Sequence, residues 1–194
     1  MAPRKYEKKA RAASTHETRG RILMASLALH SDKGFGATSW QDIADRAGVA
    51  VGTVYYHFPT IDDLVPACST LARSLVPQPD GTIFDGVRGT GKRIEVLVRA
   101  LIAYYSGTQG GIRNALRERQ QIGVVDRIVS ETERNISRLA REAIGPVPTE
   151  ETAKKVEAIL DFRTWDSLQS RGLSEEEVAE SVSSLVRALI SKRS

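Results

Sequence analysis

The chain has 194 residues, 41% of them hydrophobic and 27% charged, which is enough to bury the core of one or two soluble domains. Its longest uncharged apolar run, residues 22–29, is too short to cross a bilayer, and no apolar segment follows the basic N-terminus to make a secretory signal. The single cysteine, Cys68, excludes an internal disulfide, so these features predict a cytoplasmic protein with no membrane role.

The net charge of +4 comes entirely from the first third of the chain. Residues 1–60 hold 9 Lys and Arg against 5 Asp and Glu, whereas residues 61–194 hold 19 of each kind. A basic N-terminal third followed by a neutral remainder suggests that the N-terminal third binds a polyanion. The first 13 residues hold five of those cations and are predicted to form a flexible basic arm.

Residues 14–60 are predicted to form three helices. Ser14 and Glu17 have the spacing of a capping box, which predicts the start of the first helix. The segment SDKGFG, residues 31–36, ends this helix because its glycines favour a C-terminal turn.

The second and third of these helices are short. Thr38 and Gln41 repeat the capping-box spacing before an apolar stripe of about two turns, which Gly48 ends. The third helix is predicted over residues 51–58, because Pro59 cannot continue it.

Helical patterns continue through the rest of the chain. A fourth helix is predicted over residues 61–76, and the Gly- and Pro-rich segment 77–92 is predicted to be a flexible linker. The segment GTQGG, residues 107–111, interrupts the apolar stripe that follows. No strand is indicated. The predicted class is all-α with about nine helices, in which an N-terminal three-helix domain precedes a helical domain over residues 61–194.

Two more helices are predicted near the C-terminus. The first ends at Gly172 and follows the loop GPVPTEE, residues 145–151. The second begins at Ser174, which has a capping-box spacing to Glu177.

The helix predicted over residues 51–58 has a polar face that core packing does not require. At 100° per residue, Val51, Val54 and Phe58 lie on one side and small or polar residues lie on the other. A short helix and a glycine turn precede it, which is typical of a helix-turn-helix whose second helix enters a DNA major groove. The residues on the polar face and its flanks are Gly52, Thr53, Tyr55, Tyr56 and His57.

The segment GFGATSWQDIADRAGVAVGTVYYHFPTIDDL, residues 34–64, closely resembles the DNA-binding domain of the TetR family of transcriptional regulators. The family pattern runs G-[FY], two small residues, T-[ST], a spacer, I-A, then A-G-V, G-T-[LV]-Y and H-F. The residues that match it in register are Gly34, Phe35, Thr38, Ser39, Ile43, Ala44, Ala47, Gly48, Val49, Gly52, Thr53, Val54, Tyr55, His57 and Phe58.

The resemblance implies a homodimer that binds a palindromic double-stranded DNA operator, represses transcription, and responds to a small-molecule effector. It implies a C-terminal domain for ligand binding and dimerisation, with no enzymatic activity and no cofactor. Val51 and Ile61 stand where the family often has Lys, so the basic arm is expected to supply part of the phosphate binding. The expected DNA contacts are Thr38, Ser39, Val51, Gly52, Thr53, Tyr55, Tyr56, His57 and Thr60.

Two further sets of residues are assigned to the helical domain. Apolar and aromatic residues at helical spacing can line a ligand pocket, although core packing is the alternative for each of them. These are Leu101, Tyr104, Tyr105, Phe162 and Trp165. The apolar stripes of the last two predicted helices are wide enough for a four-helix interface between subunits, with an intrachain bundle as the alternative. Their residues are Val156, Leu160, Val178, Val182, Leu185, Val186 and Leu189.

Other functions have weaker support in the sequence. The segment GVRGTGKR, residues 86–93, imitates a phosphate loop, but Arg93 replaces the hydroxyl residue and no apolar strand precedes it. The three histidines and Cys68 have no metal-ligand spacing, so no metal site is expected. The main alternative to a regulator is a small-molecule-binding protein of the same fold that has lost specific DNA recognition.

Overall fold

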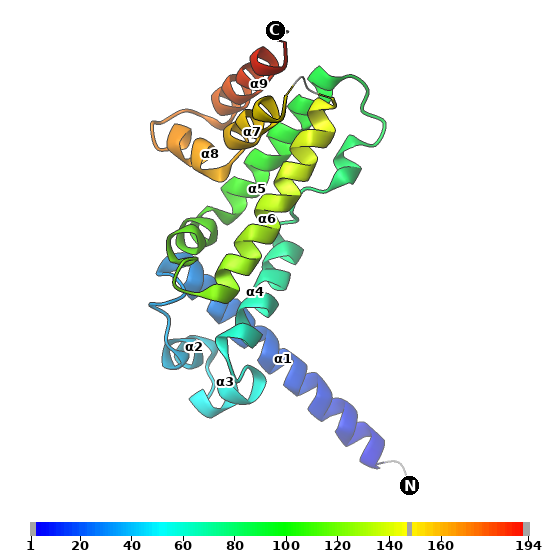
Figure 1. Cartoon of the computed structure of the whole chain (residues 1–194). Helices are drawn as coiled ribbons and strands as arrows, with labels where there is room; N and C mark the ends of the chain where they lie inside the picture. The colour runs from blue at the N-terminus through cyan, green and yellow to red at the C-terminus, as the bar shows by residue number, and fades with distance from the viewer. Residues whose placement is uncertain (1–2, 147–148, 192–194) are drawn as a thin grey trace. The chain divides into compact units, whose positions relative to one another are not determined.

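A computed structural model describes residues 3–146 and 149–191 of the chain. All regular structure in these ranges is helical, with nine α-helices, one 3-10 helix and no strand, so the predicted all-α class is confirmed (Figure 1). None of the helices described is long and apolar enough to cross a membrane. The elements are α1 (Pro3–Asp32), α2 (Trp40–Ala47), α3 (Val51–His57), α4 (Ile61–Leu75), η1 (Gly81–Phe84), α5 (Thr90–Glu118), α6 (Gly123–Ile144), α7 (Glu150–Ile159), α8 (Phe162–Gln169) and α9 (Glu175–Ser191).

The chain divides into two compact units. The first contains the chain up to Leu75 together with Gly110–Val129, and the second contains Val76–Gln109 together with the chain from Ser130 onward. The divisions fall inside α5 and α6, so each of these long helices contributes to both units. The first unit therefore contains α4 and residues 110–129 in addition to the predicted helix-turn-helix segment 14–60.

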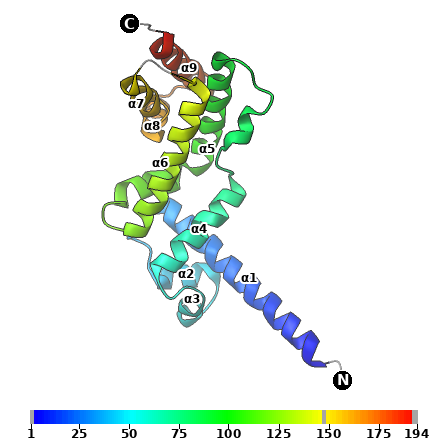
Figure 2. The ribbon, with the colours of Figure 1, turned by 45° about the vertical axis from the view of Figure 1, so that its right-hand side comes forward.

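The core of the first unit forms where α2 and α3 pack side by side against α1 and α4 (Figure 2). Ile43, Ala44 and Ala47 of α2 are buried, as the predicted apolar stripe requires. Val54 and Phe58 are only 0% and 1% exposed, so the predicted inner face of the third helix is confirmed.

The cap of α2 differs by one residue from the prediction. Ser39, not Thr38, is the N-cap, because its hydroxyl accepts from Asp42 N and the Asp42 carboxylate accepts from Ser39 N. Thr38 instead donates its hydroxyl to Gly34 O at 2.6 Å, which tightens the preceding turn. The predicted cap at Ser174 is confirmed, since its hydroxyl accepts from Glu177 N.

The prediction that a capping box at Ser14 starts the first helix is wrong. Helix α1 begins at Pro3 and runs through Ser14, so residues 3–13 are helical and not an arm without secondary structure. Ala, Lys, Arg and Glu dominate this segment and are strong helix formers, and Pro is well suited to the first helical position.

The prediction that residues 107–111 interrupt a helix is also wrong, because α5 is continuous through them. Two of the glycines sit where the helix touches another segment closely. A Cβ atom on Gly107 would lie 2.9 Å from Cγ1 of Val76, and one on Gly110 would lie 2.4 Å from Oγ of Ser31. The glycines thus permit close packing that offsets their low helix propensity.

Residues 77–92 are folded within the second unit and do not form a flexible linker. Their 3-10 helix is capped by Asp80, whose carboxylate accepts from Thr82 N at 2.9 Å. The side chain of Phe84 is buried, and the Arg93 guanidinium lies 4.6 Å from its ring centre.

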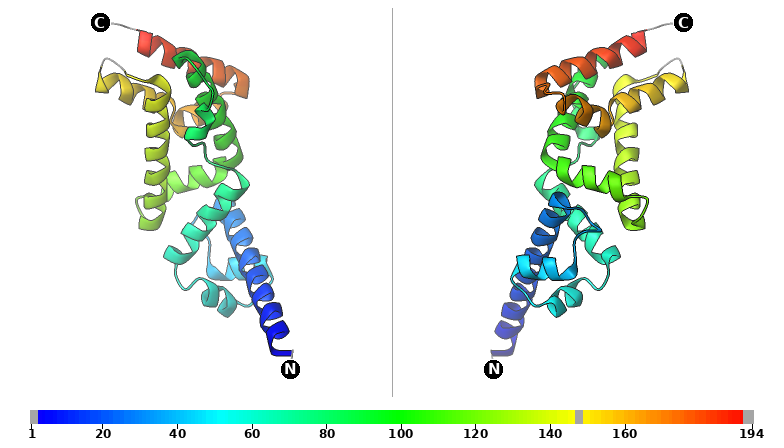
Figure 3. Two further views of the ribbon diagram at one scale, coloured as in Figure 1. Left: turned by 90° about the vertical axis from the view of Figure 1, so that its right-hand side faces the viewer. Right: turned by 90° about the vertical axis from the view of Figure 1, so that its left-hand side faces the viewer.

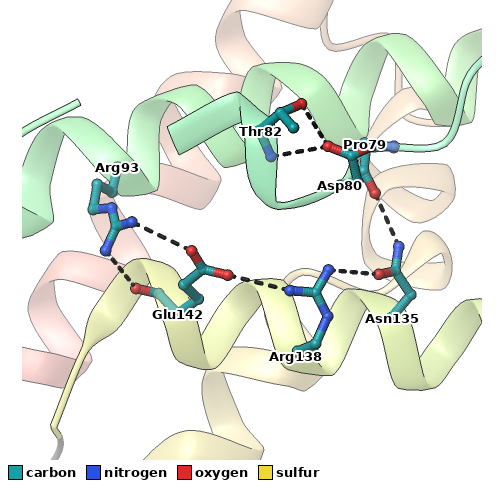
Figure 4. Close-up of polar contacts among 7 residues, drawn as sticks. All are labelled: Pro79, Asp80, Thr82, Arg93, Asn135, Arg138 and Glu142. Carbon is teal, nitrogen blue, oxygen red and sulfur yellow. Dashed lines mark hydrogen bonds and ion pairs between the residues drawn. The ribbon is translucent and has the colours of Figure 1, made fainter. Parts of the chain in front are cut away.

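Helix α6 fixes the same segment by polar contacts (Figure 4). Asn135 donates to Pro79 O at 2.9 Å, and Arg93 donates to Glu142 O at 3.1 Å. Glu142 also accepts from Arg138, so its carboxylate joins both arginines. The sequence of residues 77–92 shows only that they favour turns. It does not show that they are folded, because the residues that fix them lie on α6, 49 and 56 positions away from the residues that they bind.

The segment predicted as a single helix ending at Gly172 is divided into α7 and α8 in the second unit (Figure 3). The break lies at Leu160 and Asp161, where the Asp161 carboxylate accepts from Arg163 N and caps α8. This change of direction places Phe162 and Trp165 against Tyr105 of α5, with ring centres 5.4 and 5.8 Å from its own.

Candidate nucleic-acid interface

Helix α3 is fixed on one face and open on the other. Val54 and Phe58 attach it to the core of the first unit, while the side chain of Tyr56 on the outer face is 78% exposed. Tyr55 is 46% exposed, and its ring centre lies 5.1 Å from that of Trp40 on α2. The side chain of Tyr55 therefore packs against α2, whereas that of Tyr56 is exposed to solvent.

Gly52 has no structural reason to be glycine. It lies exposed in α3, and a Cβ atom added to it would meet nothing within 4 Å. Alanine would favour the helix at this position, since alanine is the better helix former. A glycine that weakens its own helix suits a surface that another backbone must approach closely.

The other two polar side chains of α3 are half-buried. Thr53 lies in the first turn, where its N–H donates to Ala50 O at 2.8 Å. His57 makes an edge contact with the ring of Tyr56, with ring centres 5.2 Å apart. These two residues and Gly52 surround Tyr56, so the structure brings the predicted polar face together as one short surface.

The expected contacts outside this face are engaged in turns and caps. The hydroxyls of Thr38 and Ser39 serve the turn before α2, and Thr60 caps α4 through Asp63, whose N–H it accepts at 3.2 Å. Val51 is half-buried against the core of the first unit. These four residues therefore support the helix-turn-helix, and the hydroxyls of Thr38, Ser39 and Thr60 are already hydrogen-bonded.

Several cations near the helix-turn-helix have partners within the protein. Lys33 pairs with Asp42 at 2.8 Å, and Arg46 pairs with Asp32 at 3.2 Å. The hydrogen bond from Lys33, together with those from Ser39, holds the pKa of the Asp42 carboxyl far below its usual value. The capping carboxylate thus stays ionised at the start of α2, where a negative charge stabilises the helix.

Two further arginines contact other residues of the helix-turn-helix. The Arg19 guanidinium lies 4.7 Å from the ring centre of Phe58, and Arg21 donates to Ala47 O at the C-terminal end of α2. The remaining five Lys and Arg of residues 1–60 lie between positions 4 and 11 of α1. Sequence reasoning missed Arg19 and Arg21, because an isolated arginine carries no signal of the helix end or ring that it contacts.

Residues 22–68 match the sequence model of the bacterial regulatory proteins of the tetR family. These residues form a TetR-family domain. The match contains α2, α3 and the parts of α1 and α4 that hold them, which is the segment whose geometry is described above.

The curated relatives are similar over the same part of the chain. The transcriptional repressor KstR of Rhodococcus jostii is 49% identical over 57 residues, which are 29% of this chain and 26% of that protein. The repressor KstR2 of Mycobacterium tuberculosis is 35% identical over 54 residues, 28% of this chain and 27% of that protein. The chain thus spans about a quarter of the length of the curated relatives it matches.

Solved structures extend the likeness of fold beyond the TetR-family domain. A transcriptional regulator of Saccharomonospora viridis in complex with choline has a TM-score of 0.71 and 18% identity, covering 92% of this chain and 100% of that one. The multidrug binding protein EbrR, complexed with imidazole, has a TM-score of 0.62 and 23% identity, with 91% of each chain covered.

The residues predicted to line a ligand pocket come together in the second unit. Leu101, Tyr104, Tyr105, Phe162 and Trp165 are all buried. The Tyr105 hydroxyl donates to Leu160 O at 2.7 Å, and burial raises the pKa of this phenol well above its usual value. Nε1 of Trp165 is buried without a hydrogen-bond partner in the described part of the chain. The four aromatic residues therefore form a cluster in the interior, and Leu101 is buried one helical turn before Tyr105.

A groove of about 450 Å³ lies between α6, α7 and α8, and none of those five residues lines it. Its walls carry both charges, with Glu133 and Asp161 paired to Arg163. In the sequence, nothing distinguishes these three residues from other charged residues on helices. The residues around the groove are Glu133, Ile136, Ser137, Glu157, Ala158, Asp161, Arg163 and Thr164.

Most of the residues predicted for the dimer interface lie inside the single chain. Those that are at most 4% exposed are Val156, Leu160, Val178, Val182 and Val186. Side chains so deeply buried cannot reach a partner, so their assignment to a subunit interface is corrected. They serve the packing of α7 and α8 against α9, which was the intrachain alternative. Leu185 is 51% exposed and Leu189 is half-buried, so these two remain available at the surface.

Metal and nucleotide sites gain no support. Among the described residues, no group of three or more His, Cys, Asp and Glu is placed to hold a metal ion. In the segment that imitates a phosphate loop, Arg93 is engaged by Glu142 and Phe84.

Proposed function

We propose that the protein is a ligand-responsive transcriptional regulator, a repressor that binds a double-stranded DNA operator through its TetR-family domain. The observation that carries the proposal is the outer face of α3, where Gly52 and Tyr56 are exposed and take no part in the core. A face of this kind on the second helix of a helix-turn-helix suits contact with base edges and phosphates in the major groove. The two curated relatives named above, KstR and KstR2, are repressors by name.

A dimer would place two copies of α3 on a roughly palindromic operator. Half-sites one helical turn apart are about 34 to 36 Å apart, so a change of a few Å in the spacing of the helices prevents both from binding together. Leu185 on α9 is the exposed apolar residue proposed for the centre of the subunit interface.

A small-molecule effector would bind in the second unit. The aromatic cluster around Tyr105 is the site proposed for it, because Nε1 of Trp165 is a buried donor to which a ligand oxygen or nitrogen could bind. The regulator from S. viridis binds choline and EbrR binds imidazole, which supports an organic effector for this fold.

Titration of labelled DNA from the promoter beside its own gene, at several salt concentrations, tests DNA binding. We expect Tyr56→Ala to weaken operator binding by about 1 to 3 kcal/mol. Its thermal stability should be nearly unchanged, because the removed ring is mostly in solvent. Leu75→Ala is a matched control, since Leu75 is also exposed in the first unit but lies at the far end of α4.

The alternative is a binding protein of the same fold with weak DNA recognition. Val51 and Ile61 favour it, because both are apolar where cations would meet phosphates and both pack against the protein. Equal affinity of the wild type and Tyr56→Ala for operator and unrelated DNA would support this alternative and contradict specific recognition by α3.

A further inference from the structure

The last two turns of α5 hold the turn that leads into the helix-turn-helix. Gly110, Asn114 and Glu118 are spaced four residues apart, so they lie on one face of α5. All three belong to the first unit, and each touches the segment between His30 and Gly36. We name these three residues the α5 seam.

Asn114 caps the C-terminal end of α1. Its side-chain nitrogen donates to His30 O at 2.8 Å and to Ser31 O at 2.9 Å, and only 6% of the residue is exposed. The last carbonyls of a helix have no partner within the helix, so a buried amide that binds two of them fixes where α1 ends.

Glu118 binds the backbone of the turn itself. Its carboxylate accepts from Gly36 N at 2.8 Å and from Arg117 at 2.7 Å, and a hydrogen bond from the Phe35 backbone adds to these. Burial of the carboxylate would raise its pKa, but the hydrogen bonds outweigh burial and lower it. Glu118 is therefore an ionised, largely buried acceptor, and bonds of this kind are stronger than those between neutral groups.

Two glycines make the close approach possible. Gly34 has a φ of +99°, and a Cβ atom on it would lie 2.1 Å from Oε1 of Glu118. Gly110 of α5 also lies close to Ser31 of α1, because a Cβ atom on Gly110 would lie 2.4 Å from Oγ of Ser31. A side chain at either position would push the turn away from α5, so both partners are shaped for this contact.

A hydrogen bond and an ion pair connect this turn to the start of α2. Thr38 donates to Gly34 O, and Lys33 pairs with Asp42 in the first turn of α2. The same α5 helix continues without a break from Tyr105, whose hydroxyl is bound to Leu160 in the second unit. The hydrogen bonds of Asn114 and Glu118 therefore connect the last turns of α5 directly to the turn before α2.

We propose that Asn114 and Glu118 are positioning residues through which α5 sets the operator affinity of the TetR-family domain. The inference rests on the proposed function, because it concerns how DNA binding is regulated. The contact acts on the turn between α1 and α2. Neither residue is part of the exposed face of α3, so both act without touching DNA.

Glu118→Gln tests the proposal, because it keeps the shape of the side chain and removes its charge. We expect exchange of the Gly36 and Phe35 amide hydrogens to become faster, by about tenfold for the loss of one charge-assisted hydrogen bond. Operator affinity should fall by about tenfold at a temperature where the variant is fully folded, as the turn no longer holds α2 in its binding position. Binding to unrelated DNA at low salt should change by less than about twofold, because it depends on phosphate contacts.

Two controls separate positioning from general damage. Glu142→Gln removes a carboxylate that fixes residues 77–92 in the second unit, and its operator affinity should equal that of the wild type. Cys68→Ala lowers the stability of the first unit's core without touching the α5 seam, so its operator affinity should be retained while it is folded. An equal loss of affinity in Cys68→Ala would overturn the proposal, because the loss would then follow from stability alone.

Asn114→Ala provides an independent variant if Glu118→Gln does not fold. It should weaken operator binding in the same direction and speed exchange at the end of α1. Unchanged operator affinity in a folded variant with faster amide exchange would refute the proposal while leaving the proposed function intact. A wild-type protein that binds no DNA would contradict the proposed function itself.

Discussion

At the scale of single residues, a substitution at Gly52 should change stability and operator binding in opposite directions. It lies exposed in α3 with free space around its Cα, so Gly52→Ala should raise the free energy of unfolding by about 0.5 to 1 kcal/mol. The added methyl group should weaken operator binding, because it faces the surface proposed to meet DNA. Chemical denaturation and operator titration of the same variant check both effects. A variant that is more stable and binds the operator equally well would exclude close approach of DNA at this position.

His30 predicts how the stability of the first unit depends on pH. The residue is 3% exposed beside Phe35, and burial lowers its pKa from 6.5 to about 4, although the charge of Glu118 opposes the shift. Between these two values the unfolded chain binds more protons than the folded one, so stability is fully present above pH 6.5 and decreases as the pH falls.

We expect this residue to reduce the free energy of unfolding by about 2 kcal/mol between pH 7 and pH 5. Denaturant titrations of the wild type and of His30→Leu at both pH values measure the effect. The variant should lose this part of the pH dependence. Identical dependence in the two proteins would show that His30 can be protonated in the folded state without a penalty.

At the scale of elements, α9 provides the test of the dimer. Val182 is buried in the single chain, so a charge there would unfold the protein and would not report on association. Leu185→Glu places a charge on the exposed face, where it should yield a folded monomer if two copies of α9 meet. Sedimentation velocity measures the outcome. Arg187→Glu, on a different side of the same helix, should remain dimeric, and an intact Leu185→Glu dimer would place the interface elsewhere.

The N-terminal part of α1 is the second element with a testable role. We expect the five Lys and Arg between residues 4 and 11 to bind phosphates that the apolar Val51 and Ile61 cannot neutralise. Deleting residues 1–11 should lower operator affinity and flatten the slope of log K against log salt by about 0.9 for each phosphate that the protein no longer neutralises. Discrimination between operator and mutated operator should change much less, since base edges are read by α3.

Replacing the five cations with glutamine gives a matched variant, because it removes charge and keeps residues with good helix propensity. It should reproduce the effect of the deletion. An unchanged salt slope in both variants would show that this part of α1 does not bind DNA.

At the scale of the whole molecule, the sequence was most informative where structure depends on near neighbours. The inward stripe of α2, the core face of α3 and the cap at Ser174 were predicted correctly, because helical spacing and capping act over three or four residues. The same spacing identified the all-α class. The outer face of α3 was predicted for the same reason, since residues that do not pack inward must face outward.

Two of the failed predictions share one physical cause, which is packing against residues far away in the sequence. The glycines at 107 and 110 weaken a helix locally, yet α5 continues through them because Val76 and Ser31 pack where side chains would be. The apolar stripe of α9 predicted a partner, but only the packing of α7 and α8 shows that its valines are covered within one chain.

By itself, the sequence determined the helical class, the helix-turn-helix and its resemblance to the TetR family, because local spacing and the residue pattern carry that information. Tertiary structure alone decided that residues 77–92 are folded against α6, that Tyr105 lies in an aromatic cluster, and that Glu118 binds a turn 82 residues away. Contacts between residues far apart in the chain depend on how helices pack. A single sequence specifies which faces must be buried, but it does not show which partner will bury them.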